Sequence, residues 1–418
     1  MKRGPGDGPP TTPDRSEGNK VTPNYTYLIV GGGMAADAAI EGIREVDSDR
    51  PIALIGAEPH PPYDRPPLTK GLWKGDPPES IWRKATRHNV THFLDRKVVS
   101  LDLSNKRVTD DRGASYSYDK LLLATGGTPR RLPFGGDSII YYRTVDDYTR
   151  LRELTGPSLR FAVIGGGFIG SEIAAALAMN GKEVLMLFPG EGIGSNIFPA
   201  DLSSFLNDYY REKLVQVQPH ARVTGCEEQG GRLRLTTQHA ITQEEGETIV
   251  DAVVAGIGIE PNVELARSAG LKIDNGILVD RGLRTSHADV YAAGDVANFE
   301  NPALGRRLRV EHEDNANTMG RMAGQAMAGR DVAYDHLPFF YSDLFDLGYE
   351  AVGDLDARLE TVSDWKEPHR EGVVYYLKEG RDRGVLLWNV WDQVDAARKL
   401  IAEAGPFRPE DLRGRLPA

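Results

Sequence analysis

The chain alternates short runs of apolar residues with stretches in which apolar side chains recur every three or four positions. The runs predict strands and the stretches predict helices, because a strand covered on both faces is apolar throughout whereas a surface helix is apolar on one side. Two units each contain a strand, a glycine-rich turn, a helix and a second strand. They comprise residues 25–30, 35–45 and 51–55, then 161–164, 171–180 and 183–188. This alternation predicts an α/β fold with parallel sheets.

Both units carry a glycine fingerprint between the first strand and the helix. Glycines let the backbone approach a pyrophosphate, whose negative charge then lies at the positive end of the helix. A single fingerprint can be a simple packing turn, but two in the correct context predict two Rossmann-like dinucleotide-binding domains. The residues are Gly31, Gly33, Met34, Ala35 and Ala36 in the first unit, and Gly165, Gly167, Phe168, Ile169 and Gly170 in the second.

The residue after the second strand of each unit indicates which nucleotide binds. Glu58 lies about 25 residues past Gly33, where an acidic side chain accepts the ribose hydroxyls of adenosine. In the second unit Phe188 occupies this place, and Glu191 is either a substitute from the loop or a solvated carboxylate. No arginine suited to a 2′-phosphate occurs at residues 185–196, so NADH is preferred to NADPH.

Composition excludes several classes of function. The formal net charge of -11 argues against nucleic-acid binding. Cys226 is the single cysteine and no metal constellation is evident, so redox chemistry needs a bound organic cofactor. The most apolar stretch, residues 161–181, is broken by glycines and Glu172, so no membrane span is expected. Residues 1–23 contain no signal-like apolar run, and we expect a disordered tail and a cytoplasmic protein.

Two further segments combine a buried strand with a glycine turn. Residues 120–128 read K-L-L-L-A-T-G-G-T and include Thr125 and Gly126, and residues 289–297 read D-V-Y-A-A-G-D-V-A and end a strand at Gly294 and Asp295. With the two fingerprints they resemble the FAD-dependent pyridine nucleotide oxidoreductases of glutathione reductase-like fold. The resemblance implies FAD as cofactor, with Asp295 accepting ribityl hydroxyls.

Residues 62–70, P-Y-D-R-P-P-L-T-K, narrow the resemblance to the branch of oxygenase-coupled ferredoxin reductases and apoptosis-inducing factor. Residues 307–314, 339–353 and 386–401 look most like apoptosis-inducing factor. The resemblance implies that Arg65 contacts the phosphate-ribose part of FAD. It places Lys70 beside flavin N5, where disulfide reductases carry their redox cysteines.

The same resemblance implies how hydride passes from NADH to the flavin. Lys70 and Glu172 would form an ion pair near the flavin, although Glu172 could instead be a capping acid in the first turn of its helix. Phe168 would lie between flavin and nicotinamide, or alternatively pack in the core. Tyr341 falls where the family carries an aromatic residue near the nicotinamide-binding face.

Weaker assignments complete the expected site. Glu311 and His312 begin a predicted helix over residues 311–327, and the resemblance implies that its amino end points at flavin N1 and the C2 carbonyl. His312 could alternatively be a helix cap or a packing residue. By resemblance, Gly258 matches a turn along the NADH groove, and Val99 and Arg143 match adenine- and phosphate-side contacts of FAD.

We expect a discontinuous FAD-binding domain (residues 24–146 and 277–330), an NAD-binding domain (147–276) and a C-terminal α+β interface domain (331–418). We expect a homodimer, and the resemblance implies that its formation is redox-controlled. Three functions remain open: an NADH-dependent reductase of quinone or oxygen, a reductase of a ferredoxin or rubredoxin, and a redox-switched binding module. The last would form a slow NADH-reduced charge-transfer dimer.

Overall fold

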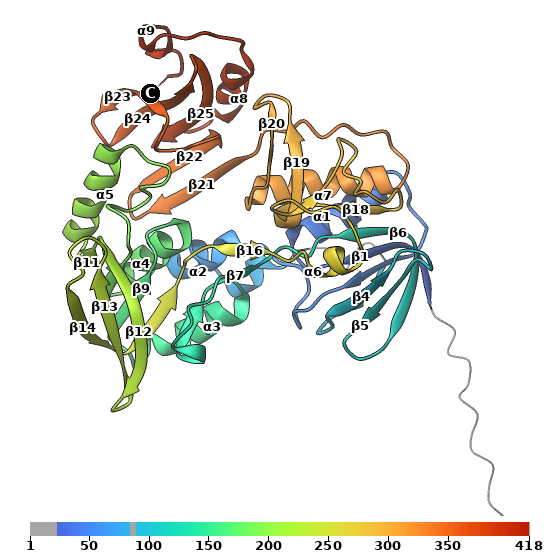
Figure 1. The fold of residues 1–418 in the computed structure, drawn as a ribbon, viewed down its shortest axis with the longest axis horizontal. Helices are drawn as coiled ribbons and strands as arrows, with labels where there is room; N and C mark the ends of the chain where they lie inside the picture. Colours follow the sequence, from blue (N-terminus) through green and yellow to red (C-terminus); the bar gives the residue numbers. More distant parts are fainter. Residues whose placement is uncertain (1–22, 84–88, 418) are drawn as a thin grey trace, which may run out of the picture.

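The computed structural model describes residues 23–83 and 89–417, and the expected tail lies outside this part up to residue 22. Three larger sheets, each with helices packed against it, carry most of the described chain (Figure 1). We call them the first sheet, the second sheet and the C-terminal sheet. The α/β class predicted from the sequence is confirmed. No helix within the described residues is long and apolar enough to cross a membrane.

The first sheet has the strand order β3-β2-β1-β6-β5-β4, with β18 also paired to β6. Strands β1, β2, β3, β6 and β18 pair in parallel, whereas β4 and β5 join antiparallel. Because β18 comes from far downstream, two separate parts of the chain build this sheet. The bounds are β1 Asn24–Val30, β2 Ile52–Ile55, β3 Val90–Phe93, β4 Val98–Asp102, β5 Arg107–Asp110, β6 Ser115–Leu123 and β18 Val290–Ala292.

Helices α1 (Met34–Arg44) and α7 (Glu313–Met327) pack together at unusually short range beside the first sheet. A Cβ at Gly320 would lie 2.3 Å from the carbonyl oxygen of Ala35, and one at Gly324 would lie 2.1 Å from that of Ala39. Only glycine permits this approach. It brings the amino-terminal ends of both helices to one cavity, which Met34, Ala35 and Ala316 help to line.

The second sheet is parallel throughout, in the order β11-β10-β9-β15-β8. Its strands are β8 Ile139–Tyr141, β9 Arg160–Ile164, β10 Glu183–Leu187, β11 Val215–Gln218 and β15 Ala252–Ala255. Its helices are α3 Val145–Leu154, α4 Phe168–Met179 and α5 Ala200–Glu212. An antiparallel sheet follows in the order β12-β13-β14, with strands Ala221–Gln229, Arg232–His239 and Glu245–Val250.

Short elements connect the sheets. Antiparallel strands β7 (Gly127–Pro129) and β16 (Ile259–Pro261) carry the chain between the first and second sheets (Figure 1). The remaining short elements are η1 Pro66–Leu68, α2 Gly71–Lys74, η2 Pro78–Ile81, η4 Gly136–Ser138, α6 Glu264–Ser268, β17 Ile277–Leu278, η5 Gly294–Val296, β19 Ala297–Asn301 and β20 Arg306–Leu308.

The C-terminal sheet is antiparallel, in the order β21-β22-β25-β24-β23, and α8 packs against β22 and β25. Its edge strand β21 lies against α4 of the second sheet and against α7 of the first. The bounds are β21 Phe339–Leu344, β22 Leu347–Gly353, β23 Glu360–Glu367, β24 Glu371–Lys378, β25 Arg381–Trp388, α8 Val394–Ala402 and α9 Pro409–Leu412.

Two sequence predictions about helix positions are wrong. The helix predicted from Glu311 begins at Glu313, because His312 has extended dihedral angles (φ −114°, ψ 147°) and occupies the N-cap position. Helix α4 begins earlier than predicted, at Phe168, so Glu172 lies beyond its first turn. The interpretation of Glu172 as a first-turn capping acid therefore fails.

Candidate functional site

The first glycine fingerprint lines a cavity of about 790 Å³. Gly31 has a φ of +133°, and a Cβ there would lie 2.0 Å from the carbonyl oxygen of Ala124. Ala36 is fully buried in the core of the first sheet and does not line the cavity. The expected FAD-side residues that do line it are Gly31, Gly33, Met34, Ala35, Glu58, Arg65, Val99, Thr125, Gly126, Arg143, Gly294 and Asp295.

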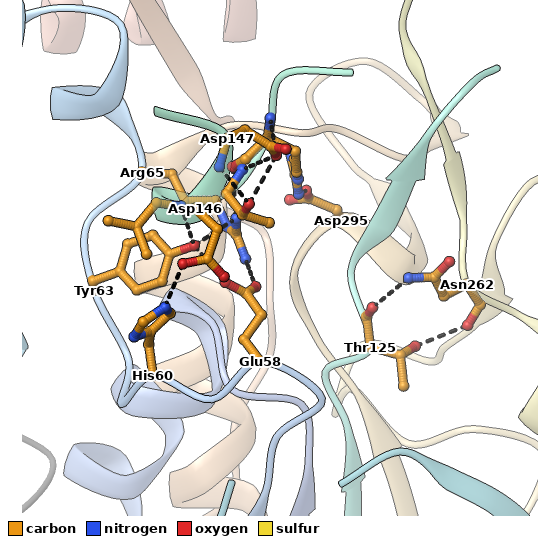
Figure 2. Close-up of polar contacts among 12 residues, drawn as sticks. Glu58, His60, Tyr63, Arg65, Thr125, Asp146, Asp147, Asn262 and Asp295 are labelled. Carbon is orange, nitrogen blue, oxygen red and sulfur yellow. Dashed lines mark hydrogen bonds and ion pairs between the residues drawn. The ribbon is translucent and has the colours of Figure 1, made fainter. Parts of the chain in front are cut away.

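Glu58 is held at the cavity by two donors from the stretch that follows β2 (Figure 2). Arg65 Nη2 lies 2.5 Å from Glu58 Oε1, and the Tyr63 hydroxyl donates to Oε2 at 2.5 Å. Burial raises the pKa of Tyr63, which therefore stays a hydrogen-bond donor. Sequence reasoning missed Tyr63, although it stands inside the P-Y-D-R-P-P-L-T-K stretch that singled out Arg65.

A second ion pair joins two segments that are distant in sequence. Arg143 Nη2 lies 2.7 Å from Asp295 Oδ2, and the backbone carbonyl of Arg143 accepts from Arg65 Nη1 at 2.8 Å. Asp147, the third residue of α3, accepts from the backbone N–H of Arg143 at 3.0 Å. These contacts fix two arginine cations and two carboxylates around the cavity.

Thr125 joins the end of the first sheet to the loop after β16. Its hydroxyl donates to the Asn262 carbonyl at 2.8 Å, and Asn262 Nδ2 donates to the Thr125 carbonyl at 2.8 Å (Figure 2). Both residues line the cavity. Asn262 was not among the expected site residues. It ends the A-G-I-G-I-E-P-N run that contains Gly258, and this position could have indicated it.

Lys70 and Glu172 form a second polar centre between the three larger sheets. Lys70 Nζ lies 2.7 Å from Glu172 Oε1, with side-chain exposures of 13% and 4%. Thr69 Oγ1 donates to Glu172 Oε2 at 2.5 Å, and Ser342 Oγ donates to Oε1 at 2.6 Å. A buried carboxylate is costly unless it is paired and hydrogen-bonded, and Glu172 is both. Sequence reasoning found the ion pair but missed Thr69 and Ser342.

Aromatic side chains surround this polar centre. Phe168 is 38% exposed, which contradicts its interpretation as a core residue, and its ring centroid is 5.0 Å from that of Phe340. The Tyr341 ring lies 5.3 Å from Lys70 Nζ, and its hydroxyl donates to Glu313 Oε2 at 3.0 Å. Phe340 and Glu313 were not expected to belong to the site. They reach it through the packing of β21 on α7, which the sequence does not reveal.

The His312 side chain packs against an aromatic ring and does not cap α7, although the residue occupies the N-cap position. Its ring stacks on Phe340 at a centroid distance of 4.4 Å, and its side chain makes no capping hydrogen bond to α7. Burial lowers the pKa of His312 to about 4, so the ring is neutral near pH 7. Glu311 lies outside the helix, and its Oε1 lies 2.8 Å from Arg309 Nη1. The same Arg309 nitrogen also donates to the backbone carbonyl of Asp295.

The second fingerprint builds a turn as tight as the first. Gly165 has a φ of +119°, and a Cβ there would lie 2.3 Å from the carbonyl oxygen of Gly256. A Cβ at Gly170 would lie 2.1 Å from the carbonyl oxygen of Gly165. Gly167 is the N-cap of α4, and Ile169 packs beside Gly256. A Cβ at Gly167 would meet nothing within 4 Å, so the start of α4 is open on that side.

The loop after β10 carries no cation. Phe188 is buried with its ring against Gly166, so no polar side chain stands where a ribose-binding acid is usual. Glu191 lies exposed further along the loop, and its carbonyl accepts from Asn207 Nδ2 at 3.0 Å. Gly258 has a φ of +87° in the loop before β16, and its carbonyl accepts from the Arg130 N–H at 2.9 Å.

Comparison with known proteins identifies the family. Residues 25–320 match the family described as pyridine nucleotide-disulphide oxidoreductase. The chain belongs to this family. Residues 323–371 and 364–403 of the oxidoreductase match the C-terminal family of mitochondrion-associated apoptosis-inducing factor. The protein is thus an apoptosis-inducing factor-like, FAD-dependent pyridine nucleotide oxidoreductase, which confirms the resemblance drawn from its motifs.

Individual relatives cover nearly the whole oxidoreductase. It is 35% identical to apoptosis-inducing factor 1, mitochondrial, of Dictyostelium discoideum, over 90% of this chain and 78% of that protein. It is also 35% identical to the ferredoxin–NAD(+) reductase component of the anthranilate 1,2-dioxygenase system of Burkholderia cepacia, over 92% and 96%. A ferredoxin reductase structure from Rhodopseudomonas palustris superposes with a TM-score of 0.84 at 30% identity, over 93% and 96%.

The residues present fit the FAD that the family implies. The backbone at Gly31 leaves no room for a Cβ, and the adjoining cavity offers the cations Arg65 and Arg143 together with the acceptors Glu58 and Asp295. The phosphates of FAD need cations such as these arginines, and its ribose and ribityl hydroxyls need acceptors such as these carboxylates. Within residues 23–83 and 89–417, no group of three or more His, Cys, Asp or Glu side chains could hold a metal ion.

Proposed function

We propose that this FAD-dependent oxidoreductase takes its electrons from NADH rather than NADPH. The observation that carries the proposal is the loop after β10, where buried Phe188 is followed by the exposed carboxylate of Glu191. Recognition of a 2′-phosphate requires a nearby cation, and residues 185–196 contain neither lysine nor arginine. A carboxylate in this loop repels a phosphate and can accept a ribose hydroxyl.

The chain's own residues supply position and electrostatics. Bound FAD supplies a centre that accepts hydride from a nicotinamide and can release the electrons to another acceptor. The fingerprints at Gly31 and Gly165 offer the two nucleotides separate cradles. Lys70, held by Glu172, keeps a cation at the polar centre, and its remaining N–H groups can orient an amide or a ring nitrogen.

We propose a small redox protein as the electron acceptor. This is supported by the 35% identity to a ferredoxin–NAD(+) reductase component across 96% of that protein's length. The net charge of -11 favours a partner that is not itself strongly acidic, because like charges slow association. A quinone or molecular oxygen is the alternative acceptor of the same reductase reaction.

A second candidate function is a redox-controlled binding module. The match of residues 323–371 and 364–403 to the C-terminal family of apoptosis-inducing factor favours it. In this function NADH reduces the protein slowly, and the reduced protein changes its self-association instead of passing electrons on. A homodimer formed only after reduction is its distinguishing property.

Anaerobic mixing tests these proposals. Bleaching of the flavin absorbance is followed in a stopped-flow instrument with a concentration series of NADH and, separately, of NADPH. We expect the apparent second-order rate constant to be at least about tenfold higher with NADH, the discrimination that one charge contact typically provides. Equal constants, or a higher constant with NADPH, contradict the proposed donor.

The reduced protein is then exposed in turn to a ferredoxin, a rubredoxin, a quinone and air while light scattering is recorded. Fast reoxidation by an iron–sulfur protein alone supports the proposed acceptor, and fast reoxidation by the quinone or by oxygen contradicts it. Slow reoxidation by every acceptor, accompanied by a doubling of the scattering mass, supports the binding module instead.

A further inference from the structure

The Glu172 carboxylate receives hydrogen bonds from side chains attached to two other parts of the fold. Lys70 and Thr69 come from the segment between η1 and α2, whereas Ser342 comes from β21 of the C-terminal sheet. Glu172 itself stands in α4 of the second sheet. One carboxylate therefore joins helix α4, the segment between η1 and α2, and edge strand β21 of the C-terminal sheet.

Ser342 and Lys70 share the same carboxylate oxygen. Lys70 Nζ lies 2.7 Å and Ser342 Oγ lies 2.6 Å from Glu172 Oε1, while Thr69 Oγ1 takes Oε2. Hydrogen bonds on both oxygens oppose rotation of the carboxylate about its terminal torsion, which is otherwise soft. The Ser342 hydroxyl thereby fixes the oxygen that in turn fixes the ammonium group.

The strand that carries Ser342 is held firmly at both ends. At its start the Phe339 N–H donates to Asp314 Oδ2 of α7 at 3.2 Å, and near its end Asp343 pairs with Lys74 of α2 at 2.7 Å. Ser342 is 1% exposed and lies opposite Tyr349 in the antiparallel register. A hydroxyl presented by such a strand has little freedom to leave its acceptor.

We propose that Ser342 is a positioning residue for flavin reduction, acting through Glu172 on Lys70. The proposal rests on reduction of the bound flavin by a nicotinamide nucleotide. It assigns the C-terminal sheet a direct part in that half-reaction, beyond covering the site. Ser342 touches neither nucleotide cradle, so its removal is expected to affect the reaction without loosening either nucleotide.

The matched pair of variants is Ser342→Ala and Ser115→Ala. Ser115 is a half-buried residue of β6, and its hydroxyl shares a 3.0 Å hydrogen bond with the Thr109 hydroxyl of β5, away from Glu172 and from the cavity of the first fingerprint. In anaerobic stopped-flow with NADH we expect Ser342→Ala to lower the limiting rate of flavin bleaching about tenfold, the typical effect of one hydrogen bond to a charged group. Bound FAD per chain and the NADH concentration at half saturation are expected to stay at the wild-type values.

A double-mutant cycle separates positioning from general loss of structure. In a Glu172→Gln background Ser342→Ala should have little further effect on the limiting rate, because its acceptor has already lost the charge that holds Lys70. Wild-type rates in Ser342→Ala, a rate loss as large in Ser115→Ala, or the same rate loss from Ser342→Ala in the wild-type and Glu172→Gln backgrounds each overturn the proposal. If the wild type prefers NADPH, the proposed donor is wrong, and the same comparison is made with NADPH.

Discussion

Lys70 Nζ lies 2.7 Å from Glu172 Oε1, which joins the segment after η1 to a helix of the second sheet through a largely buried ion pair. Breaking such a pair by removing one partner leaves an uncompensated charge. Lys70 Nζ lies 5.3 Å from the centre of the Tyr341 ring, and neither Lys70 nor Glu172 lines the 790 Å³ cavity of the first fingerprint. The cavity of the first fingerprint and the polar centre at Lys70 and Glu172 are thus built from different residues and can be tested separately.

Lys70→Ala is expected to slow flavin reduction by NADH at least about tenfold while FAD stays bound, because the cation at the polar centre is lost. Rapid-mixing absorbance and the FAD content of the purified protein are the two measurements. Lys366→Ala is the control, since Lys366 forms an exposed pair with Glu371 and stands on β23, at the opposite edge of the C-terminal sheet from β21. Equal rates of flavin reduction in the wild type and in Lys70→Ala would contradict the proposed role of Lys70.

Glu58→Ala is expected to weaken retention of FAD, with release of the yellow colour on dilution and gel filtration. The variant removes a ribose acceptor and also leaves Arg65 and Tyr63 without their common partner. A loss of about 1–3 kcal/mol of binding free energy is typical when such a group goes unpaired. Glu260→Ala, which removes a 73% exposed carboxylate, should retain FAD fully. Full retention in both variants contradicts the assignment of Glu58.

Asp382 is expected to make the protein less stable as pH rises. Burial raises the pKa of this carboxyl in β25 to about 8, and its Oδ2 has no hydrogen-bond partner among the described residues. The folded state keeps a proton that the unfolded chain, in which the aspartate pKa is 3.8, has lost, so stability falls between about pH 4 and pH 8 and stays low above pH 8.

Asp382→Asn should raise the melting temperature of the FAD-loaded protein more at pH 8–9 than at pH 5, because most of the loss of stability lies between these pH values, and the difference is on the order of a few kcal/mol. Thermal unfolding followed from pH 5 to pH 9 measures this. Asp356→Asn is the contrasting variant, because Arg358 lowers the pKa of Asp356 to about 2 and its charge is therefore favourable. A gain that is the same at pH 5 and pH 9 would contradict the role of ionisation.

His312 is expected to contribute no proton to the reaction. Its pKa of about 4 keeps the ring neutral, whereas an unfolded chain with a value of 6.5 takes up a proton, so stability should fall as pH drops from about 6.5 toward 4. His312→Phe preserves the stack on Phe340 and should keep the wild-type rate of flavin reduction from pH 6 to pH 8. A loss above about tenfold in this variant would assign the imidazole a chemical role.

Several features were accessible from sequence because their signals are local. The turns at Gly31 and Gly165 need positive φ and leave no space for a Cβ, and both requirements concern residues adjacent to a strand and a helix. The start of α7 was missed by two residues, because the extended backbone of His312 follows from its packing on Phe340 of another sheet. The sequence pattern of residues 311–327 does not predict the contact between His312 and Phe340.

The sequence by itself determined the family, the two fingerprints and the strand–helix alternation, since steric and periodic constraints act over a few neighbouring residues. Only the tertiary structure decided which side chains surround the ion pair of Lys70 and Glu172. Thr69 and Ser342 are ordinary hydroxyl residues in sequence, and they become the partners of Glu172 because the segment between η1 and α2, helix α4 and strand β21 pack around one buried carboxylate that must be satisfied. That requirement depends on burial, and burial is a property of the whole packed chain.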